Sequence, residues 1–325
     1  MKSPDKGHAG RGRASGNVWL AGTSGPECPA PQKLLPESSN ASPILAMSVD
    51  VEPWWASDLL GDGWDPVEDE LPEKAGHILD LLDQSGGKAT FFVLGEVAER
   101  QPGMVEEIHR RGHEVASHGY DHTSLHRLTP QEFRRREERT IEVLSALTGE
   151  RPLGFRAANY SVTEKTSWLY PILRQLGYRY SSSLFPVRTP FYGVPGSPLS
   201  PFPVQEDSEG DGGREGSALV EFPLTVYRGR SLRFLKIPIC GGAYLRFQPT
   251  SLVIRLLKNT LARGPAVFLI HPRDLFPPPD PPPGLGPLVR GALFGSLGDT
   301  RVKFLRILQS FQVKPLREVL FPPDP

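Results

Sequence analysis

Short apolar runs alternate along the chain with segments whose apolar residues recur at helical spacing. The runs have the length and composition of buried strands, and the periodic segments have the length of helices. The predicted strands are residues 44–49, 89–94, 113–117, 153–157, 178–182, 219–222, 266–270 and 313–316. The predicted helices are residues 73–84, 97–111, 129–147, 163–176, 251–261 and 300–310. Repeated strand–helix units predict an α/β fold of parallel strands with outer helices, either a (β/α) barrel or an open sheet.

Three stretches break this rhythm because they are rich in glycine, proline or small polar residues. The chain has 33 glycines and 35 prolines among 325 residues, and many of them lie in these stretches. We predict that residues 1–42 form a disordered N-terminal extension and residues 43–325 one catalytic domain. Within that domain, residues 205–217 are expected to form a flexible insertion and residues 276–287 a proline-rich surface loop.

Composition narrows the function. The 37 basic and 37 acidic side chains balance, so no basic excess is present to bind nucleic acid. The two cysteines, Cys28 and Cys240, favour neither a disulfide framework nor a zinc ribbon, and Cys240 is expected to be a buried small apolar residue. No apolar run has the length of a membrane span, and residues 18–21 are too short for the core of a signal peptide. We therefore expect a cytoplasmic protein.

Ionisable residues follow four of the predicted strands, where the active site of a parallel α/β fold forms. They are Asp50 and Glu52, then His118 and His122, then Arg156, and finally His271 with Arg273 and Asp274. Each has an ordinary alternative role when taken singly, such as a solvated loop end, a structural salt bridge or a capped strand end. Their occurrence at four strand ends favours a common site.

Two histidines and one carboxylate are typical ligands of a catalytic divalent metal. His118 and His122 are four residues apart and would face one ion if the segment makes a helical turn. Glu52 would be the third ligand. His126 continues the spacing but is not needed once the carboxylate binds.

The remaining polar residues suit hydrolysis of an amide. Asp50 is the candidate general base. It lies two residues before Glu52, and residues two apart on a strand point to the same side. His271 can donate a proton to a leaving amine, and Arg156 can hold Asp50 ionised. Asn159 can position a substrate carbonyl.

At this point the sequence resembles a known family, the NodB-homology polysaccharide deacetylases, also called carbohydrate esterase family four. The resemblance covers roughly residues 44–320, and within the family it is nearest to the branch associated with exopolysaccharide clusters and exosortases. The matching motifs are Ser48-Val-Asp50-Val-Glu52, Ser117-His118-Gly-Tyr-Asp-His122, Gly154-Phe-Arg156-Ala-Ala-Asn-Tyr160 and Leu269-Ile-His271-Pro. The resemblance implies a distorted (β/α) barrel that removes N-acetyl groups from a hexosamine polymer. It also implies that Asp50 is the base, that Glu52, His118 and His122 hold zinc or a similar ion, and that His271 is the acid.

The chain departs from the family pattern at several positions. Glu52 stands where most members have an aspartate, and Ser181 stands where many have an aspartate that supports the late histidine. Asp274 can take over that support. The branch usually has Trp-Glu after His-Pro, whereas this chain has Arg273-Asp274.

Aromatic residues follow the first motif. Trp54 and Trp55, together with Trp64, can form a wall on which sugar rings stack, or a packed loop. With Asn159 and Tyr160, Trp54 and Trp55 complete the predicted substrate-binding set. Gly241 and Gly242 indicate a turn or a close approach of the backbone.

The preferred interpretation is a metal-dependent hydrolase that acts on an acetylated amino-sugar polymer or oligosaccharide. One alternative is a hydrolase of a small amide or cyclic imide with the same fold. Another is a degraded domain that only binds glycan. The sequence leaves the polymer, the metal and the oligomeric state open.

Overall fold

The computed structural model describes residues 42–56, 70–189, 192–205, 218–229, 236–277, 284–296 and 298–322. Most of the predicted extension and insertion, the centre of the proline-rich loop and Trp64 therefore lie outside the described residues. Within the described ranges, no helix combines the length and the apolar character needed to cross a bilayer.

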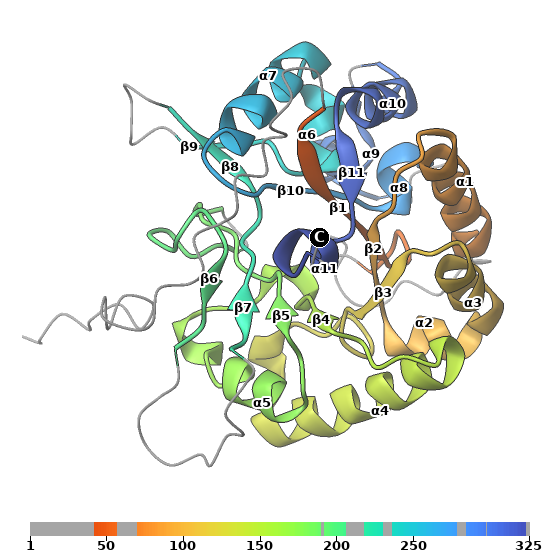
Figure 1. Ribbon diagram of the computed structural model, residues 1–325, viewed down its shortest axis with the longest axis vertical. Helices are drawn as coiled ribbons and strands as arrows, with labels where there is room; N and C mark the ends of the chain where they lie inside the picture. The colour runs from red at the N-terminus through yellow and green to blue at the C-terminus, as the bar shows by residue number, and fades with distance from the viewer. Residues whose placement is uncertain are drawn as a thin grey trace, which may run out of the picture.

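A curled and largely parallel sheet forms the centre of the molecule (Figure 1). Its strands follow the order β10-β1-β2-β3-β4-β5-β7-β6, and β11 pairs with β1. They are β1 (Ile44–Val51), β2 (Thr90–Val93), β3 (Glu114–Ser117), β4 (Gly154–Phe155), β5 (Tyr180–Ser181), β6 (Phe202–Pro203), β7 (Val220–Glu221), β10 (Val267–Ile270) and β11 (Gln312–Lys314). Only β6 pairs antiparallel among these described strands. The predicted α/β class, a distorted (β/α) barrel, is confirmed.

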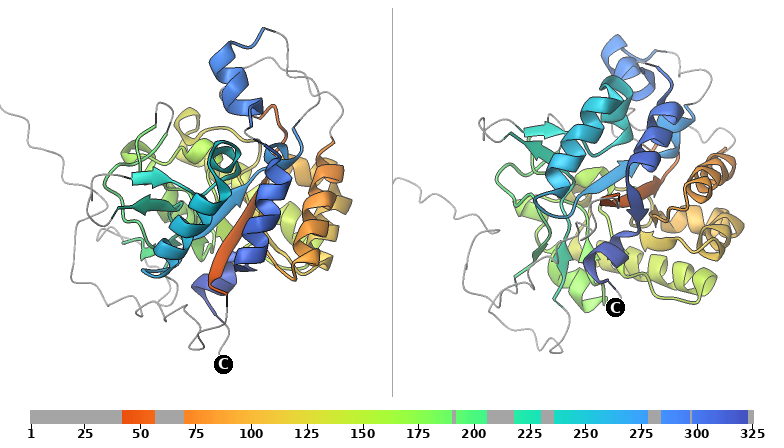
Figure 2. Two further views of the ribbon diagram at one scale, coloured as in Figure 1. Left: turned by 90° about the horizontal axis from the view of Figure 1, so that it is seen from above. Right: turned by 45° about the horizontal axis from the view of Figure 1, so that its top comes forward.

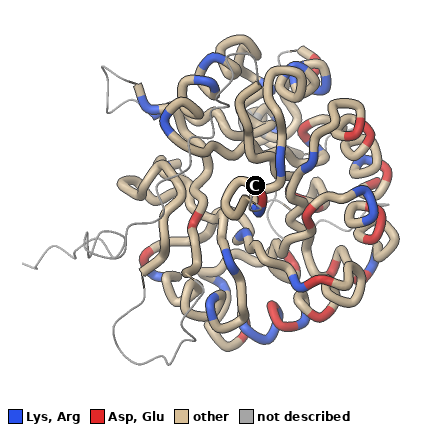
Figure 3. The backbone as a smooth tube through the Cα atoms, viewed as in Figure 1, with Lys and Arg blue, Asp and Glu red and all other residues tan. Residues whose placement is uncertain are grey.

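Helices surround the sheet (Figure 2), and charged residues crowd the outer helices α1, α3 and α4 (Figure 3). The helices are α1 (Leu71–Gln84), α2 (Gly95–Arg100), α3 (Pro102–Arg110), α4 (Pro130–Thr148), α5 (Leu169–Gln175), α6 (Gly242–Phe247), α7 (Thr250–Leu261), α8 (Pro272–Leu275), α9 (Pro287–Phe294), α10 (Thr300–Ser310) and α11 (Leu316–Leu320). Short 3₁₀ turns lie at Leu125–Arg127, Ala158–Tyr160 and Glu164–Thr166, and a separate hairpin is formed by β8 (Val226–Arg228) and β9 (Lys236–Pro238).

Helix α11 closes the end of the curl at which the strands begin. The backbone amide of Leu316 donates to Thr90 Oγ1 at 2.8 Å, and that of Arg317 donates to Glu114 Oε2 at 3.2 Å. Leu316 and Val319 pack inside the sheet with residues such as Phe92. Because this end is filled, the opposite end, where the strands finish, is left for a site.

Local sequence signals explain several helix boundaries. Thr129 caps α4 with a reciprocal bond to Glu132, and Gly149 ends it in the left-handed region with φ 73°, so the predicted boundary is confirmed. The single helix predicted over 97–111 is wrong, because Pro102 starts a second helix after Gln101.

Two further predicted elements need correction. The helix predicted over 163–176 begins as a 3₁₀ turn, and the α-helix starts only at Leu169. The strand predicted over 313–316 ends at Lys314, because Leu316 enters α11 and is buried inside the curl.

Candidate active site

The site lies at the carboxyl ends of the parallel strands. Asp50 is near the end of β1 and Glu52 follows it directly. His118 follows β3, Arg156 follows β4, and His271 follows β10. These strands are neighbours or near neighbours in one sheet, so their ends converge on the same small region.

Glu52, His118 and His122 form a group that can hold a metal ion, with ligand atoms all within 4.8 Å of one another. Glu52 Oε2 lies 3.2 Å from His118 Nε2 and 2.5 Å from His122 Nε2. The other ring nitrogen of His118 lies 2.9 Å from the carbonyl oxygen of Arg156, which orients the imidazole.

The two histidines meet without the helical turn that their spacing predicted, so this local prediction is wrong. Residues 118–122 form an irregular loop, in which Gly119 has φ 82° and His122 has φ 59°. Asp121 holds the loop, since its carboxylate accepts from Thr123 and pairs with Arg136 of α4. The sequence analysis did not identify these contacts of Asp121, because only its position between the two histidines marks this residue in the sequence.

Asp50 and Arg156 form a buried ion pair. Arg156 Nη1 lies 2.6 Å from Asp50 Oδ1, and the two residues are 0% and 1% exposed. Burial disfavours the guanidinium charge, but Asp50 raises the pKa of Arg156 above its usual range. Ser48 and Ser182 accept further hydrogen bonds from Arg156, so the guanidinium is held in one orientation.

The second carboxylate oxygen of Asp50 faces the space shared by the histidines. Asp50 Oδ2 lies 3.9 Å from His118 Nε2, 3.8 Å from His271 Nε2 and 3.3 Å from the hydroxyl of Tyr160. A proton acceptor is thereby placed next to both the metal ligands and a potential proton donor.

Asp274, in the first turn of α8, supports His271. Asp274 Oδ2 lies 3.0 Å from His271 Nδ1 and accepts from the His271 backbone amide at 2.9 Å. Burial raises the pKa of Asp274, but His271 and Arg246 outweigh it and lower that pKa to about 2. Ser181, at the position expected for a supporting aspartate, instead contacts Ser183 at 2.8 Å.

Gly242 makes room for Asp274. A Cβ atom on Gly242 would lie 2.4 Å from Asp274 Oδ2, so a larger residue would displace the carboxylate. The sequence predicted a turn or a close backbone approach for Gly241 and Gly242. The close approach is found at Gly242, and its partner is a residue of the site.

Arg273 contacts the candidate metal ligand directly. Arg273 Nη1 donates to Glu52 Oε1 at 2.5 Å, whereas the other oxygen, Oε2, lies near His118 and His122. Burial opposes ionisation of Glu52, but the positive charges of His122 and Arg273 hold the pKa of its carboxyl well below its usual range. The sequence marked Arg273 as a departure from the family pattern without indicating this contact.

Among the predicted substrate-binding residues, Tyr160 contacts the centre through Asp50 Oδ2. Asn159 and Tyr160 adopt left-handed φ angles of 54° and 48°, a region that asparagine tolerates and that is strained for tyrosine. The Asn159 amide donates to Ser124 Oγ at 2.9 Å. Trp54 packs edge-on against Phe294 with ring centroids 6.1 Å apart, and Trp55 is half-buried.

Two other residues weighed in the sequence occupy ordinary places. His126 is exposed in the turn after the metal-ligand loop and belongs to no metal-holding group among the described residues. Cys240 is buried, as expected, and burial raises the pKa of its thiol to about 12.

Comparison with known proteins agrees with this geometry. Residues 62–181 match the family model "Polysaccharide deacetylase". Over these residues the chain is similar to polysaccharide deacetylases. Residues 182–321, which include His271 and Asp274, match a second model described as a domain of unknown function, DUF3473.

Curated relatives are similar to this chain over short stretches. A peptidoglycan-N-acetylglucosamine deacetylase of Bacillus cereus is 43% identical over 75 residues, which are 23% of this chain and 27% of that protein. A peptidoglycan deacetylase-like protein of Gibberella zeae is 35% identical over 111 residues, 34% of this chain and 32% of that protein. The matches thus span about a quarter to a third of the relatives' length.

Two solved structures share the fold over most of the chain. A polysaccharide deacetylase structure from Mycobacterium smegmatis has a TM-score of 0.54 at 20% identity, covering 85% of this chain and 88% of that chain. An allantoinase structure has a TM-score of 0.54 at 17% identity, covering 95% of this chain and 96% of that chain. At these identities the likeness concerns the fold.

Proposed function

We propose that this protein is a metal-dependent hydrolase that removes N-acetyl groups from an amino-sugar polymer. The observation that carries the proposal is the convergence of a Glu52-His118-His122 ligand group with two supported proton-transfer residues. Those residues are Asp50, paired with Arg156, and His271, paired with Asp274.

The ligand group suits a divalent ion such as Zn²⁺. Its donors are two imidazole nitrogens and one carboxylate oxygen, which leaves coordination positions for water or substrate. An ion held there would supply Lewis-acid polarisation of the acetamido carbonyl and a water of lowered pKa.

Asp50 is the residue placed to accept a proton from the attacking water. Its Oδ1 is occupied by Arg156, so Oδ2 is the oxygen that faces the ligand group. The buried guanidinium fixes the orientation of the carboxylate, which a general base requires. The hydroxyl of Tyr160 lies beside the same oxygen and can help to position the reacting groups.

His271 is the residue placed to protonate the departing amine. Its Nδ1 is held by Asp274, so Nε2 points toward Asp50 and Glu52. The carboxylate of Asp274 fixes the tautomer and stabilises the charged imidazole, as expected for a histidine that alternates between acid and base.

The experiment is metal analysis of the purified protein followed by acetate release from N-acetylglucosamine oligomers. We expect about one ion per chain, acetate release, and loss of both after His122→Ala. The matched control is His126→Ala in the same loop region, which is expected to retain metal and activity. Acetate release that persists after complete removal of the metal would contradict the proposal, and hydrolysis of cyclic ureides instead of glycans would favour the small-amide alternative.

A further inference from the structure

The carboxylates of Asp50 and Glu52 share one arrangement. Asp50 Oδ1 lies 2.6 Å from Arg156 Nη1, whereas its Oδ2 lies 3.9 Å from His118 Nε2. Glu52 Oε1 lies 2.5 Å from Arg273 Nη1, whereas its Oε2 lies 3.2 Å from His118 Nε2. Each carboxylate therefore holds an arginine with one oxygen and turns the other oxygen toward His118.

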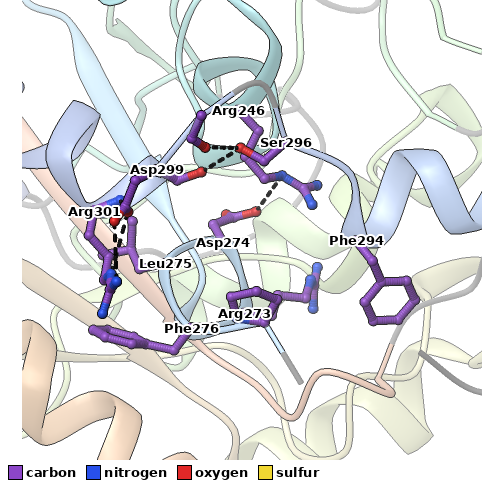
Figure 4. Close-up of a pocket in the computed structure, with 12 residues that line it drawn as sticks. Arg246, Arg273, Asp274, Leu275, Phe276, Phe294, Ser296, Asp299 and Arg301 are labelled. Atoms are coloured by element: carbon purple, nitrogen blue, oxygen red, sulfur yellow. Dashed lines mark hydrogen bonds and ion pairs between the residues drawn. The ribbon is translucent and has the colours of Figure 1, made fainter. Parts of the chain in front are cut away.

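Arg273 reaches Glu52 from α8, along the wall of a pocket of about 420 Å³. In Figure 4 its side chain extends between Asp274 and Phe294. Three arginines line this pocket, and each is paired with a carboxylate. The pairs are Arg246 with Asp274, Arg301 with Asp299, and Arg273 with Glu52. Of the three, Arg273 is the one whose partner is a candidate metal ligand, so this pairing bears on the metal centre.

The pairing limits both the geometry and the charge of Glu52. This residue is 3% exposed, so its negative charge depends on partners inside the protein. Its Oε1 accepts a hydrogen bond from Arg273, and His271 Nε2 lies 3.5 Å from the same oxygen. Within the described ranges, Arg273 forms no second ion pair. A cation bound to Glu52 would therefore meet a carboxylate with one oxygen occupied and its charge partly offset.

We propose that Arg273 is a positioning residue of the metal centre, which holds Glu52 as a ligand through Oε2 alone and moderates the affinity for the ion. The inference rests on the proposed metal-dependent function and adds to it how the carboxylate is presented. With Oε1 kept on the guanidinium, Glu52 fills one coordination position and leaves the others to water and substrate. Hydrogen-bond partners of ligating side chains tune metal centres in this way.

The first test measures the affinity for Zn²⁺ by competition with a chelator. Arg273→Gln is expected to bind Zn²⁺ about tenfold more tightly, the lower end of the range over which partners of ligands tune metal affinity. The reason is that Glu52 loses its competing cation and its second oxygen becomes free. If Arg273 only supported the orientation of Glu52, its loss would weaken binding instead.

A second variant separates charge from the contacts of the new side chain. Arg273→Met is neutral and of similar length, and it is expected to tighten Zn²⁺ binding in the same direction. Because position 273 lines the pocket, a smaller side chain there enlarges the pocket and leaves no void in the core. Both variants are therefore expected to fold, which circular dichroism checks. The matched control is Arg301→Gln, which removes an exposed arginine of the same pocket whose partner is Asp299, and its affinity is expected to be unchanged.

The second test is the crystal structure of the Zn²⁺-loaded protein. In the wild type we expect Oε2 of Glu52 at about 2.0–2.2 Å from the ion, the usual zinc–carboxylate distance, with Oε1 still paired with Arg273. In Arg273→Gln we expect both oxygens of Glu52 to approach the ion.

The outcomes separate this role from the function on which it rests. Unchanged or weaker Zn²⁺ binding in either Arg273 variant would overturn the role of Arg273, and so would tighter binding in Arg301→Gln. Zinc bonded to both oxygens of Glu52 in the wild type would overturn it as well. Each of these results leaves the metal-dependent hydrolase standing. A wild-type protein that binds no zinc at Glu52 would overturn the ligand group, and the proposed function and this inference with it.

Discussion

The carboxylate of Asp274 offers the most direct test of the proton-transfer scheme. Asp274→Asn keeps an oxygen that can accept from the His271 backbone amide, so the start of α8 is expected to persist. The substitution removes the negative charge from the side of His271 Nδ1. Without that charge, the imidazolium that protonates the departing amine is less stable.

The magnitude follows from the pKa of Asp274. Burial alone would raise it, yet His271 and Arg246 lower it from an ordinary 3.8 to about 2. This shift of about 1.8 pKa units corresponds to roughly 2.5 kcal/mol of net interaction with the charged partners, at about 1.4 kcal/mol per unit. His271 makes the largest of these favourable contributions. We therefore expect kcat to fall by up to roughly 60-fold, with a smaller change in KM.

The assay is the initial rate of acetate release from N-acetylglucosamine oligomers, with folding checked by circular dichroism. The control is Asp83→Asn, which removes an exposed aspartate of α1 that pairs with Lys88. This variant is expected to retain wild-type kcat. Asp274→Ala is expected to lose more activity than Asp274→Asn, because it also removes the acceptor at the start of α8. A kcat for Asp274→Asn equal to that of the wild type would refute the reasoning.

The same shift predicts acid sensitivity. Because the folded-state pKa lies below the ordinary value, the stabilisation from Asp274 is present above pH 3.8 and is lost as the pH falls through about 2. The difference in unfolding free energy between wild type and Asp274→Asn is therefore expected to shrink across that interval. A difference that stays constant down to pH 2 would contradict the assigned ion pairs.

Three further substitutions test other parts of the site, and a fourth tests Glu137, a buried carboxyl of α4 outside the site that accepts from Ser117 and Tyr178. Asp50→Asn is expected to retain metal and lower kcat by at least about 10²-fold, measured by acetate release with parallel metal analysis. His118→Ala is expected to lose the ion, and an unchanged metal content would remove it from the ligand group. Gly242→Ala is expected to lower kcat by displacing Asp274, so wild-type kcat in the folded variant would contradict the close approach. Burial raises the pKa of Glu137 from 4.5 to about 7, so folding loses stability as the pH rises through that interval. The unfolding free energy of Glu137→Gln relative to the wild type is therefore expected to rise by up to roughly 3 kcal/mol between pH 4.5 and 7. Denaturant unfolding at these two pH values is the measurement, and a difference that does not change with pH would contradict the prediction.

Much of the architecture could be predicted from the sequence because its signals are local. Buried strands are short apolar runs, and a helix start such as Thr129-Pro130 depends on residues within one turn. The placement of polar residues after the strands was equally informative, since parallel strands end at one edge of a sheet. Asp50, Glu52 and His118 could thus be assigned to one region before any distance was known.

The sequence by itself therefore determined the strand–helix order, the polar residues at the strand ends and the resemblance to polysaccharide deacetylases. Only the tertiary structure decided how those residues pair. Arg273 and Glu52 are 221 positions apart, and Gly242 admits Asp274 from a different helix. The helical turn predicted from the spacing of His118 and His122 was also wrong. The segment is an irregular loop held by the ion pair between Asp121 and Arg136 of α4. Such contacts depend on how distant segments pack, and no periodicity within one segment encodes that packing.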